Sequence, residues 1–289
     1  GNYDYLMYAD IDFKHPEVIQ NLYDWVYWFI ETTGVQGFRL DAVKHIDSFF
    51  MRNFIRDITA KYGEDFYVFG EFWNSDETAN NDYLKNTEYR FDLVDVKLHH
   101  NFFDASIAGA DFDLRTIFDQ TLAKNHPESA VTFVDNHDTQ RGQALESTVE
   151  EWFKPAAYAL ILLREEGLPC VFYGDYYGIS GEFAQESFQD VLDKLLDIRL
   201  NLAYGEQTDY FDDTNCIGWT RQGKGGGQPI AVVVSNDQAS SKRMLVGSEW
   251  AGREFSDYLV KSSQIVTIDE DGWGEFPVEE KSVSVWSVK

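Results

Sequence analysis

Three acidic residues, Asp41, Glu71 and Asp138, each follow a short apolar run of the sequence. Cleavage of a glycosidic bond needs two carboxyl groups that flank the bond, one as nucleophile or base and one as proton donor. A third carboxylate can stabilise the positive charge that develops on the sugar in the transition state. The chain holds 50 Asp and Glu residues, so position alone leaves a structural role open. The neighbouring Arg39 and His137 favour a chemical role.

Asp4, Asp10 and Asp12 form a second acidic group, near the first residue of the chain. Calcium takes about six to eight oxygen ligands, and a loop that offers several Asp side chains and carbonyl groups is its usual host. In a chain this acidic, the spacing alone fits ordinary surface carboxylates equally well.

Helices and short strands alternate along the first part of the sequence. Apolar residues recur at every third or fourth position in the expected helices 16–33, 49–62, 114–124, 152–166 and 188–202. Short apolar strands are expected between them at 35–40, 66–70, 130–134 and 168–173. This alternation predicts a parallel sheet that is buried on both faces. The candidate residues follow the strands at their C-terminal ends, where parallel α/β folds place their sites.

The sequence pattern changes after about residue 203. Turn residues separate short strand-like runs, which are expected at 217–221, 230–234, 243–246, 265–268 and 283–288. This pattern is typical of an antiparallel β domain. We therefore expect two domains, an α/β domain over residues 1–203 and an all-β domain over residues 204–289.

The composition excludes several classes of partner. The chain has 24 Lys and Arg residues against 50 Asp and Glu, which gives a formal net charge of −26. It lacks the basic surplus that nucleic acids and anionic membranes require, so we expect neither as a partner. No apolar run approaches the roughly 18 residues of a membrane-spanning helix. Two cysteines, Cys170 and Cys216, are too few for a disulfide scaffold or a cysteine-based zinc site.

Three segments of the sequence resemble motifs of one known family. Segments 37–45, 70–73 and 133–138 are similar, in order and spacing, to the nucleophile, acid/base and third-carboxylate segments of the α-amylase family, glycoside hydrolase family 13. The resemblance runs nearly end to end and is closest to the C-terminal part of the liquefying bacterial α-amylases. It implies an α/β fold, the C-terminal part of a TIM barrel (about strands 4–8), followed by an antiparallel β-sandwich. The upstream strands and the protruding subdomain of the family are not in this chain.

The resemblance also implies the catalytic roles. Asp41 matches the nucleophile, Glu71 the acid/base and Asp138 the stabiliser of the transition state. Because the acid must carry a proton while the nucleophile is ionised, the two environments must differ. We expect Arg39 to favour the charged form of Asp41, and burial under Trp73 to favour the protonated form of Glu71.

Six positions match residues that contact substrate in the family. Arg39 stands where the family holds a positive charge against the nucleophile, and aromatic rings such as Trp73 suit stacking on sugars or packing in the wall of a cleft. The expected substrate-binding residues are Arg39, Lys44, His45, Trp73, Asn136 and His137.

The resemblance implies calcium, with sodium at an adjacent site. Asp4, Asp10 and the main-chain carbonyl of His45 match ligands of the family's central calcium, and Asp12 matches the second cation site. Some relatives bind a further calcium between barrel and C-terminal domain through His and Asp residues. Here the counterparts are Thr214, Asn215 and Asn236, which argues against that site.

The leading hypothesis is retaining endo-hydrolysis of α-1,4-glucosidic bonds in starch, glycogen and related glucans, through a β-glycosyl-enzyme on Asp41. A second hypothesis is a non-catalytic glucan-binding or assembly fragment, whose partner is the N-terminal part of the same enzyme as a second chain or missing segment. A third keeps the mechanism but changes the bond or acceptor, as in transglycosylases and α-1,6-acting relatives. Because the two cysteines show no sign of pairing, we expect the cytoplasm, with secretion as the alternative.

Overall fold

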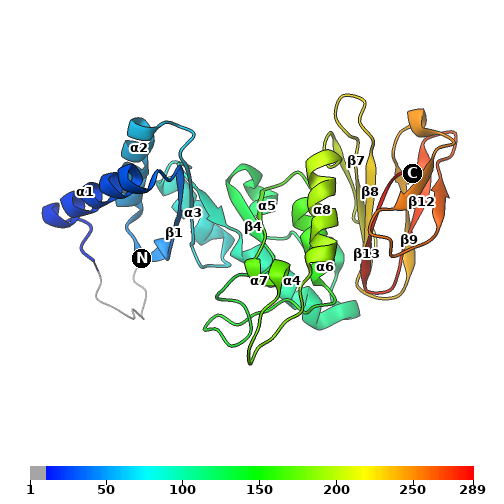
Figure 1. Cartoon of the computed structure of the whole chain (residues 1–289), viewed down its shortest axis with the longest axis horizontal. Coiled ribbons are helices and arrows are strands. Elements are labelled where there is room, and N and C mark those ends of the chain that lie inside the picture. Colours follow the sequence, from blue (N-terminus) through cyan, green and yellow to red (C-terminus); the bar gives the residue numbers. More distant parts are fainter. Residues whose placement is uncertain (1–10) are drawn as a thin grey trace. The chain divides into compact units, whose positions relative to one another are not determined.

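The computed structural model describes residues 11–289 (Figure 1). These residues form two compact units. The first contains the residues up to Lys97 together with Gln120–Val131, and the second contains Leu98–Asp119 and Thr132–Lys289. The predicted boundary between residues 203 and 204 stays a prediction. Of the helices among the described residues, none is long and apolar enough to cross a membrane.

Parallel strands and helices alternate in the first unit. Gly37 pairs with Tyr67, Phe69 with Asp92 and Leu93 with Ala130. The elements are α1 (Pro16–Thr33), β1 (Gly37–Leu40), α2 (Ser48–Tyr62), β2 (Tyr67–Gly70), α3 (Glu77–Asn86), β3 (Asp92–Val94), α5 (Leu122–Asn125) and the beginning of β4 (Ala130–Phe133).

Local sequence explains where these elements begin and end. Pro16 occupies the first turn of α1, where its missing N–H costs nothing, and Gly34 closes the helix in the left-handed conformation. The side chain of Asp47 accepts the N–H of Phe50 and so caps the first turn of α2. At Gly37 a Cβ atom would lie 2.3 Å from the carbonyl oxygen of Tyr67, so the close approach of β1 and β2 requires glycine.

The second unit continues the parallel sheet and adds helices beside it. The strand order β1-β2-β3-β4-β5 confirms the parallel part of the expected barrel. The apolar helix α6 is buried on all sides, and Figure 1 shows it beside α8. The elements are α4 (Val96–Ala108, which begins in the first unit), α6 (Lys154–Leu162), β5 (Leu168–Cys170), α7 (Tyr173–Tyr177) and α8 (Gln189–Asn201).

The C-terminal part of the second unit is an antiparallel β-sandwich, as expected. A six-stranded sheet in the order β11-β10-β13-β8-β7-β6 and a two-stranded sheet, β12-β9, bury Val233, Phe255, Phe276 and Trp286. The strands are β6 (Gln207–Tyr210), β7 (Cys216–Arg221), β8 (Ile230–Ser235), β9 (Ser240–Leu245), β10 (Glu254–Asp257), β11 (Ile265–Thr267), β12 (Trp273–Val278) and β13 (Ser282–Val288).

The prediction of a helix over residues 114–124 is wrong. The chain forms a 3₁₀ turn at Leu114–Thr116 and then a separate short helix, α5. Gln120 has a φ of 61°, which an α-helix cannot include, and the side chain of Thr121 starts the new helix by accepting the N–H of Lys124. Helices α3 and α4 and strand β3 were not expected from the sequence pattern.

An arginine joins the helices of the second unit to its β-sandwich. Arg164, directly after α6, donates two hydrogen bonds to the carboxylate of Asp209 at 2.7 and 2.9 Å. Its guanidinium also lies over the rings of Phe118, Phe211 and Trp219. Such two-pronged, stacked geometry suits arginine and not lysine.

Two asparagines form a second junction in the same unit. The side-chain amide of Asn236 donates to the carbonyls of Gly109 and Phe112, both at 2.8 Å. Asn215 donates to the carbonyl of Ala110 at 2.7 Å and to the side-chain oxygen of Asn236 at 2.9 Å. Carbonyl oxygens at this junction therefore accept amide hydrogens, and the absence of a calcium ion here stays a prediction.

Candidate active site

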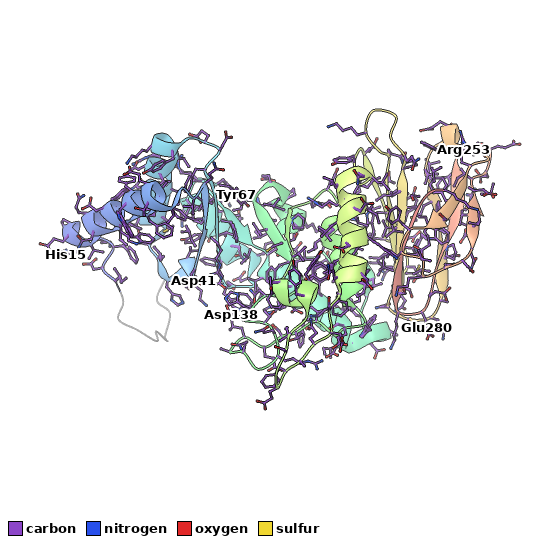
Figure 2. All side chains as sticks on the ribbon, viewed as in Figure 1. His15, Asp41, Tyr67, Asp138, Arg253 and Glu280 are labelled. Carbon is purple, nitrogen blue, oxygen red and sulfur yellow. The ribbon has the colours of Figure 1, made fainter. Side chains whose placement is uncertain are left out.

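Two of the three candidate carboxylates lie at neighbouring strand ends of the first unit. Leu40 pairs with Gly70 in the parallel ladder, so Asp41 and Glu71 follow β1 and β2 at the same edge of the sheet. Figure 2 labels Asp41 at the end of β1. The N–H of Glu71 donates to the carbonyl of Leu40 at 2.8 Å, and the N–H of Val43 donates to the carbonyl of Glu71 at 2.9 Å. The backbone therefore fixes both positions.

Arg39 brings the two carboxylates together. Its Nη1 contacts Asp41 Oδ1, and its Nη2 lies 3.0 Å from Glu71 Oε1. The side chain of Glu71 is 9% exposed and that of Asp41 is 75% exposed. The two carboxyl groups therefore have different environments, one buried in the protein and the other exposed to solvent.

The turn after β1 holds Glu71 from a second direction. Ala42 has a φ of 48°, and its N–H donates to Glu71 Oε2 at 3.2 Å. The phenol of Tyr83, on α3, donates to the carbonyl of Val43 at 3.0 Å and is buried. The sequence analysis missed Tyr83, because α3 itself was not expected.

Lys44, His45 and Trp73 lie in the segments that follow β1 and β2. Lys44 Nζ donates to the carbonyl of Trp73 at 3.2 Å, which joins the segments after β1 and β2. Lys44 and His45 also line a hollow of about 690 Å³ in the first unit, together with Asp12, Asp47 and other residues. Two of the expected substrate-binding residues are therefore accessible from one concave surface.

The expected cation ligands are described only in part. Asp4 and Asp10 lie outside the described residues. Asp12 is exposed, accepts the N–H of Lys14 at 2.9 Å and lines the same hollow as His45. Within residues 11–289, no group of three or more His, Cys, Asp or Glu side chains is placed to hold a metal ion. Carboxylate and carbonyl oxygens are the ligands that a hard cation such as calcium prefers, but the described residues alone do not supply a complete ligand set.

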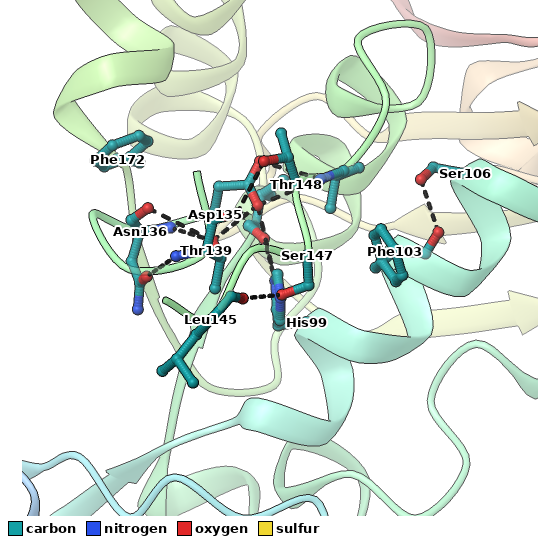
Figure 3. A network of polar contacts seen from close by, with 12 residues as sticks. His99, Phe103, Ser106, Asp135, Asn136, Thr139, Leu145, Ser147, Thr148 and Phe172 are labelled. Carbon is teal, nitrogen blue, oxygen red and sulfur yellow. Dashed lines mark hydrogen bonds and ion pairs between the residues drawn. The ribbon is translucent and has the colours of Figure 1, made fainter. Parts of the chain in front are cut away.

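The second unit holds the third carboxylate in a tight loop after β4. The side-chain oxygen of Asn136 accepts the N–H groups of Asp138 and Thr139, both at 2.9 Å (Figure 3). His137 Nε2 lies 3.2 Å from Asp138 Oδ2, and the two side chains are 64% and 34% exposed. Asn136 thus sets the loop backbone, while His137 and Asp138 face outward.

Buried polar groups stabilise that loop. The hydroxyl of Thr139 donates to Asp135 Oδ1 at 3.0 Å, and the N–H of Val149 lies 3.3 Å from both oxygens of Asp135 (Figure 3). Burial raises the pKa of Asp135 to about 6, although the ammonium group of Lys154 acts in the opposite direction. The sequence analysis missed Asp135 and Lys154 as supports of the loop.

The fold and the carboxylates define a class. A parallel α/β sheet with carboxyl groups at its C-terminal edge, followed by a β-sandwich, is the arrangement of a glycoside hydrolase built on a TIM barrel. The family model described as alpha amylase, catalytic domain, matches residues 2–228, and that described as alpha-amylase C-terminal matches residues 230–287. The chain belongs to the α-amylase family.

Curated relatives agree with this assignment. The chain is 48% identical to an alpha-amylase of Geobacillus stearothermophilus over 288 residues, which is 99% of this chain and 52% of the relative. It is 39% identical over 298 residues to the cytoplasmic alpha-amylase of Escherichia coli, covering 100% of this chain and 60% of the relative. The chain thus spans about half the length of the relatives it matches.

A solved structure of an alpha-amylase from Geobacillus thermoleovorans has the same fold. It superposes with a TM-score of 0.74 at 22% identity and covers 96% of this chain and 65% of that one. The shared fold includes the partial barrel and the β-sandwich.

Proposed function

We propose that the protein hydrolyses α-1,4-glucosidic bonds inside starch, glycogen and related glucans, with retention of the anomeric configuration. The observation that carries the proposal is the guanidinium of Arg39, which contacts Asp41 and Glu71 together. Retaining enzymes need their two carboxyl groups close, so that one reaches the anomeric carbon while the other reaches the leaving oxygen.

The reaction proceeds in two displacements. Glu71 gives its proton to the glycosidic oxygen as that bond breaks, and Asp41 attacks the anomeric carbon to form a β-glycosyl ester. Glu71, now a carboxylate, takes a proton from water, whose oxygen displaces Asp41 and restores the α configuration. Arg39 compensates the negative charge that passes between the two carboxyls.

The remaining candidate residues bind and orient the glucan. Asp138 stabilises the oxocarbenium-like transition state, and His137 and Asn136 bind sugar hydroxyls and hold Asp138 in position. Lys44, His45 and Trp73 contact the glucan on the leaving-group side, and Trp73 offers a ring for stacking. These roles rest on the family motifs and on the contacts within each unit.

Calcium completes this proposal, with sodium at an adjacent site. The central calcium would take Asp4, Asp10 and the carbonyl of His45, and the second cation would take Asp12. A bound ion of this kind supplies structural order and no chemical step. Removing calcium with a chelator should lower the melting temperature, and alanine at Asp10 should abolish that effect while alanine at the exposed Asp271 should not.

The proposed partners are the α-glucan and the N-terminal part of the enzyme, either as the missing segment or as a second chain. The chain spans about half of its relatives. The second candidate function is a glucan-binding or assembly fragment that needs the N-terminal half for activity. Nucleic acids and membranes are not proposed, because the net charge is −26.

One experiment tests both candidates. Starch hydrolysis is measured for this chain alone and for the complete polypeptide, and proton NMR follows the anomer released first. Release of the α-anomer by the complete polypeptide supports retaining hydrolysis. Starch hydrolysis by the complete polypeptide but not by this chain alone supports the second candidate, a fragment that needs the N-terminal half. Release of the β-anomer would exclude retention. Pullulan cleavage without maltooligosaccharides from starch would exclude α-1,4 specificity.

We also propose the cytoplasm as its location. Cys170 and Cys216 are both free, as expected where thiols are kept reduced. The relative from Escherichia coli carries the name cytoplasmic alpha-amylase. Cell fractionation of the source organism tests this, and recovery of the protein from the medium would support the secreted alternative.

A further inference from the structure

A buried lysine of the second unit has three partners. Lys154 Nζ lies 2.9 Å from Asp135 Oδ2 and donates to Gln185 Oε1 at 2.8 Å and to Asp175 Oδ1. An ammonium group has three hydrogens, and here each has an acceptor. The side chain of Lys154 is 1% exposed, and those of Asp135 and Asp175 are 0% exposed. The cluster is therefore fully buried and closely paired.

The partners of Lys154 come from two segments that follow different strands. Asp135 is the second residue after β4, and its carboxylate accepts the hydroxyl of Thr139 at the end of the loop that holds Asp138. Asp175 lies on α7, after β5, and accepts the phenol of Tyr158 at 2.6 Å and the amide of Gln185 at 2.8 Å. Lys154 thus connects the loop after β4 to the segment after β5.

Stability alone does not account for this cluster. Bringing two carboxylates and one ammonium group out of water costs free energy that their attraction only partly returns, and well-packed apolar side chains often serve stability equally well. A closely paired buried cluster does restrict where its members lie. Asp135 is such a member, and the next residues, Asn136 to Thr139, carry the exposed carboxylate.

We propose that Lys154 is a positioning residue for Asp138. Lys154 acts through Asp135. Its ammonium group holds the carboxylate of Asp135, which accepts the hydroxyl of Thr139. Thr139 ends the turn in which the side-chain oxygen of Asn136 accepts the N–H groups of Asp138 and Thr139. Lys154 does not touch the substrate. The inference concerns the order of the loop, and its catalytic consequence rests on the proposed role of Asp138.

The first test measures the order of the loop without any substrate. In Lys154→Met, the amide hydrogens of Asp138 and Thr139 should exchange at least about tenfold faster than in the wild type. Arg164→Met is the matched control: it also removes a buried cation from two carboxylates of this unit, Asp209 and Glu166, but has no contact with the loop. In Arg164→Met, the amide hydrogens of Asp138 and Thr139 should exchange at the wild-type rate when the two proteins are compared at the same free energy of unfolding.

A second variant covers the case in which Lys154→Met fails to fold. Lys154→Met combined with Asp175→Asn keeps the cluster's net charge at −1 and removes the ammonium group together with one of its two carboxylates, so fewer buried charges lack a partner. It should show the same faster exchange in the loop. Unchanged exchange at Asp138 and Thr139 in both variants, or equal acceleration in Arg164→Met, would overturn the proposal.

The catalytic consequence is measured in the complete polypeptide. The double variant should lower kcat on starch about 100-fold and leave KM nearly unchanged, because a displaced stabiliser affects the transition state more than substrate binding. If the wild type has no starch activity, the proposed function fails, while the exchange result still decides the role of Lys154. An active wild type whose kcat does not fall in the double variant would exclude Lys154 as a positioning residue.

Discussion

Arg39 organises the proposed chemistry at the scale of single residues. One guanidinium serves two carboxyls that differ strongly in exposure. Glu71 is buried and Asp41 is exposed, and both contact the single positive charge of Arg39. The arrangement therefore suits a site in which one carboxyl is an acid and the other a nucleophile.

Glu71→Gln should reduce kcat on starch by several orders of magnitude, because the amide keeps the shape of the side chain but cannot donate the proton that the leaving oxygen needs. The fold and glucan binding should persist in the complete polypeptide. Rates on starch and binding of maltooligosaccharides check these expectations. Near-normal starch activity would overturn the assignment of the site.

An activated substrate provides the control for this variant. An aryl maltooligoside has a leaving group that needs little protonation, so its first step should suffer much less in Glu71→Gln. Pre-steady-state release of the aryl group measures that step directly. Equal losses on both substrates would remove Glu71 from the role of acid.

Arg39→Lys should lower kcat about 100-fold, because an ammonium group keeps the charge but cannot hold two carboxylates in a fixed fork. Steady-state kinetics on starch checks this. Arg115→Lys is the control, since Arg115 pairs with the neighbouring Asp113 and is half exposed. The same fall in both variants would show a general effect on stability.

At the scale of elements, α3 supports the turn after β1 through one hydrogen bond. Tyr83→Phe removes the phenol that donates to the carbonyl of Val43. The carbonyl of Val43 keeps the N–H of Ile46 as a donor at 3.0 Å, so the variant loses one ordinary hydrogen bond and the free energy of unfolding should fall by about 1 kcal/mol. Chemical denaturation measures it, and Tyr62→Phe, which loses only a weak surface contact with Glu31, should have little effect.

The elements that the sequence predicted best are those with a strong repeating pattern and clear end signals. The apolar face of α1 lies between Pro16 and Gly34, and both ends agree with the structure. The helix expected at 114–124 failed because apolar spacing does not reveal the left-handed backbone at Gln120. Helix α4 was missed because His and Asn residues interrupt its apolar face, although His99 and Asn101 are buried.

The same contrast holds for the site. Asp41, Glu71 and Asp138 could be predicted because each follows an apolar strand in a recognisable motif. Lys154 and Asp175 could not, because a lysine at the first position of an apolar helix looks solvated, and its partners are distant in sequence. Pairings of this kind depend on tertiary packing and have no local pattern.

At the scale of the whole molecule, His99 makes stability depend on pH. It is buried, with Nδ1 2.6 Å from the carbonyl of Val134 and Nε2 2.8 Å from the hydroxyl of Ser147. Burial lowers the pKa of His99 to about 3. The stability from keeping His99 neutral is therefore full above the unfolded pKa of about 6.5 and is lost as pH falls toward 3.

His99→Gln should flatten the acid side of the stability profile by a few kcal/mol, an order-of-magnitude figure. Asp135 acts with the opposite sign: its pKa is raised to about 6, so it gains stability as pH falls from 6 toward the unfolded value. Comparison of variant and wild type largely removes that contribution. Denaturation at pH 7 and pH 4 measures the difference, and parallel profiles would contradict the role of His99.

The junction of Asn215 and Asn236 has a consequence for how the molecule responds to its surroundings. Amide groups carry their own hydrogens, so this contact between helix ends and β-sandwich needs no dissolved ion. The contribution of this junction to stability should be the same at high and low concentrations of divalent cations and in the presence of a chelator. Any loss of heat resistance on chelation would therefore have its origin outside this junction.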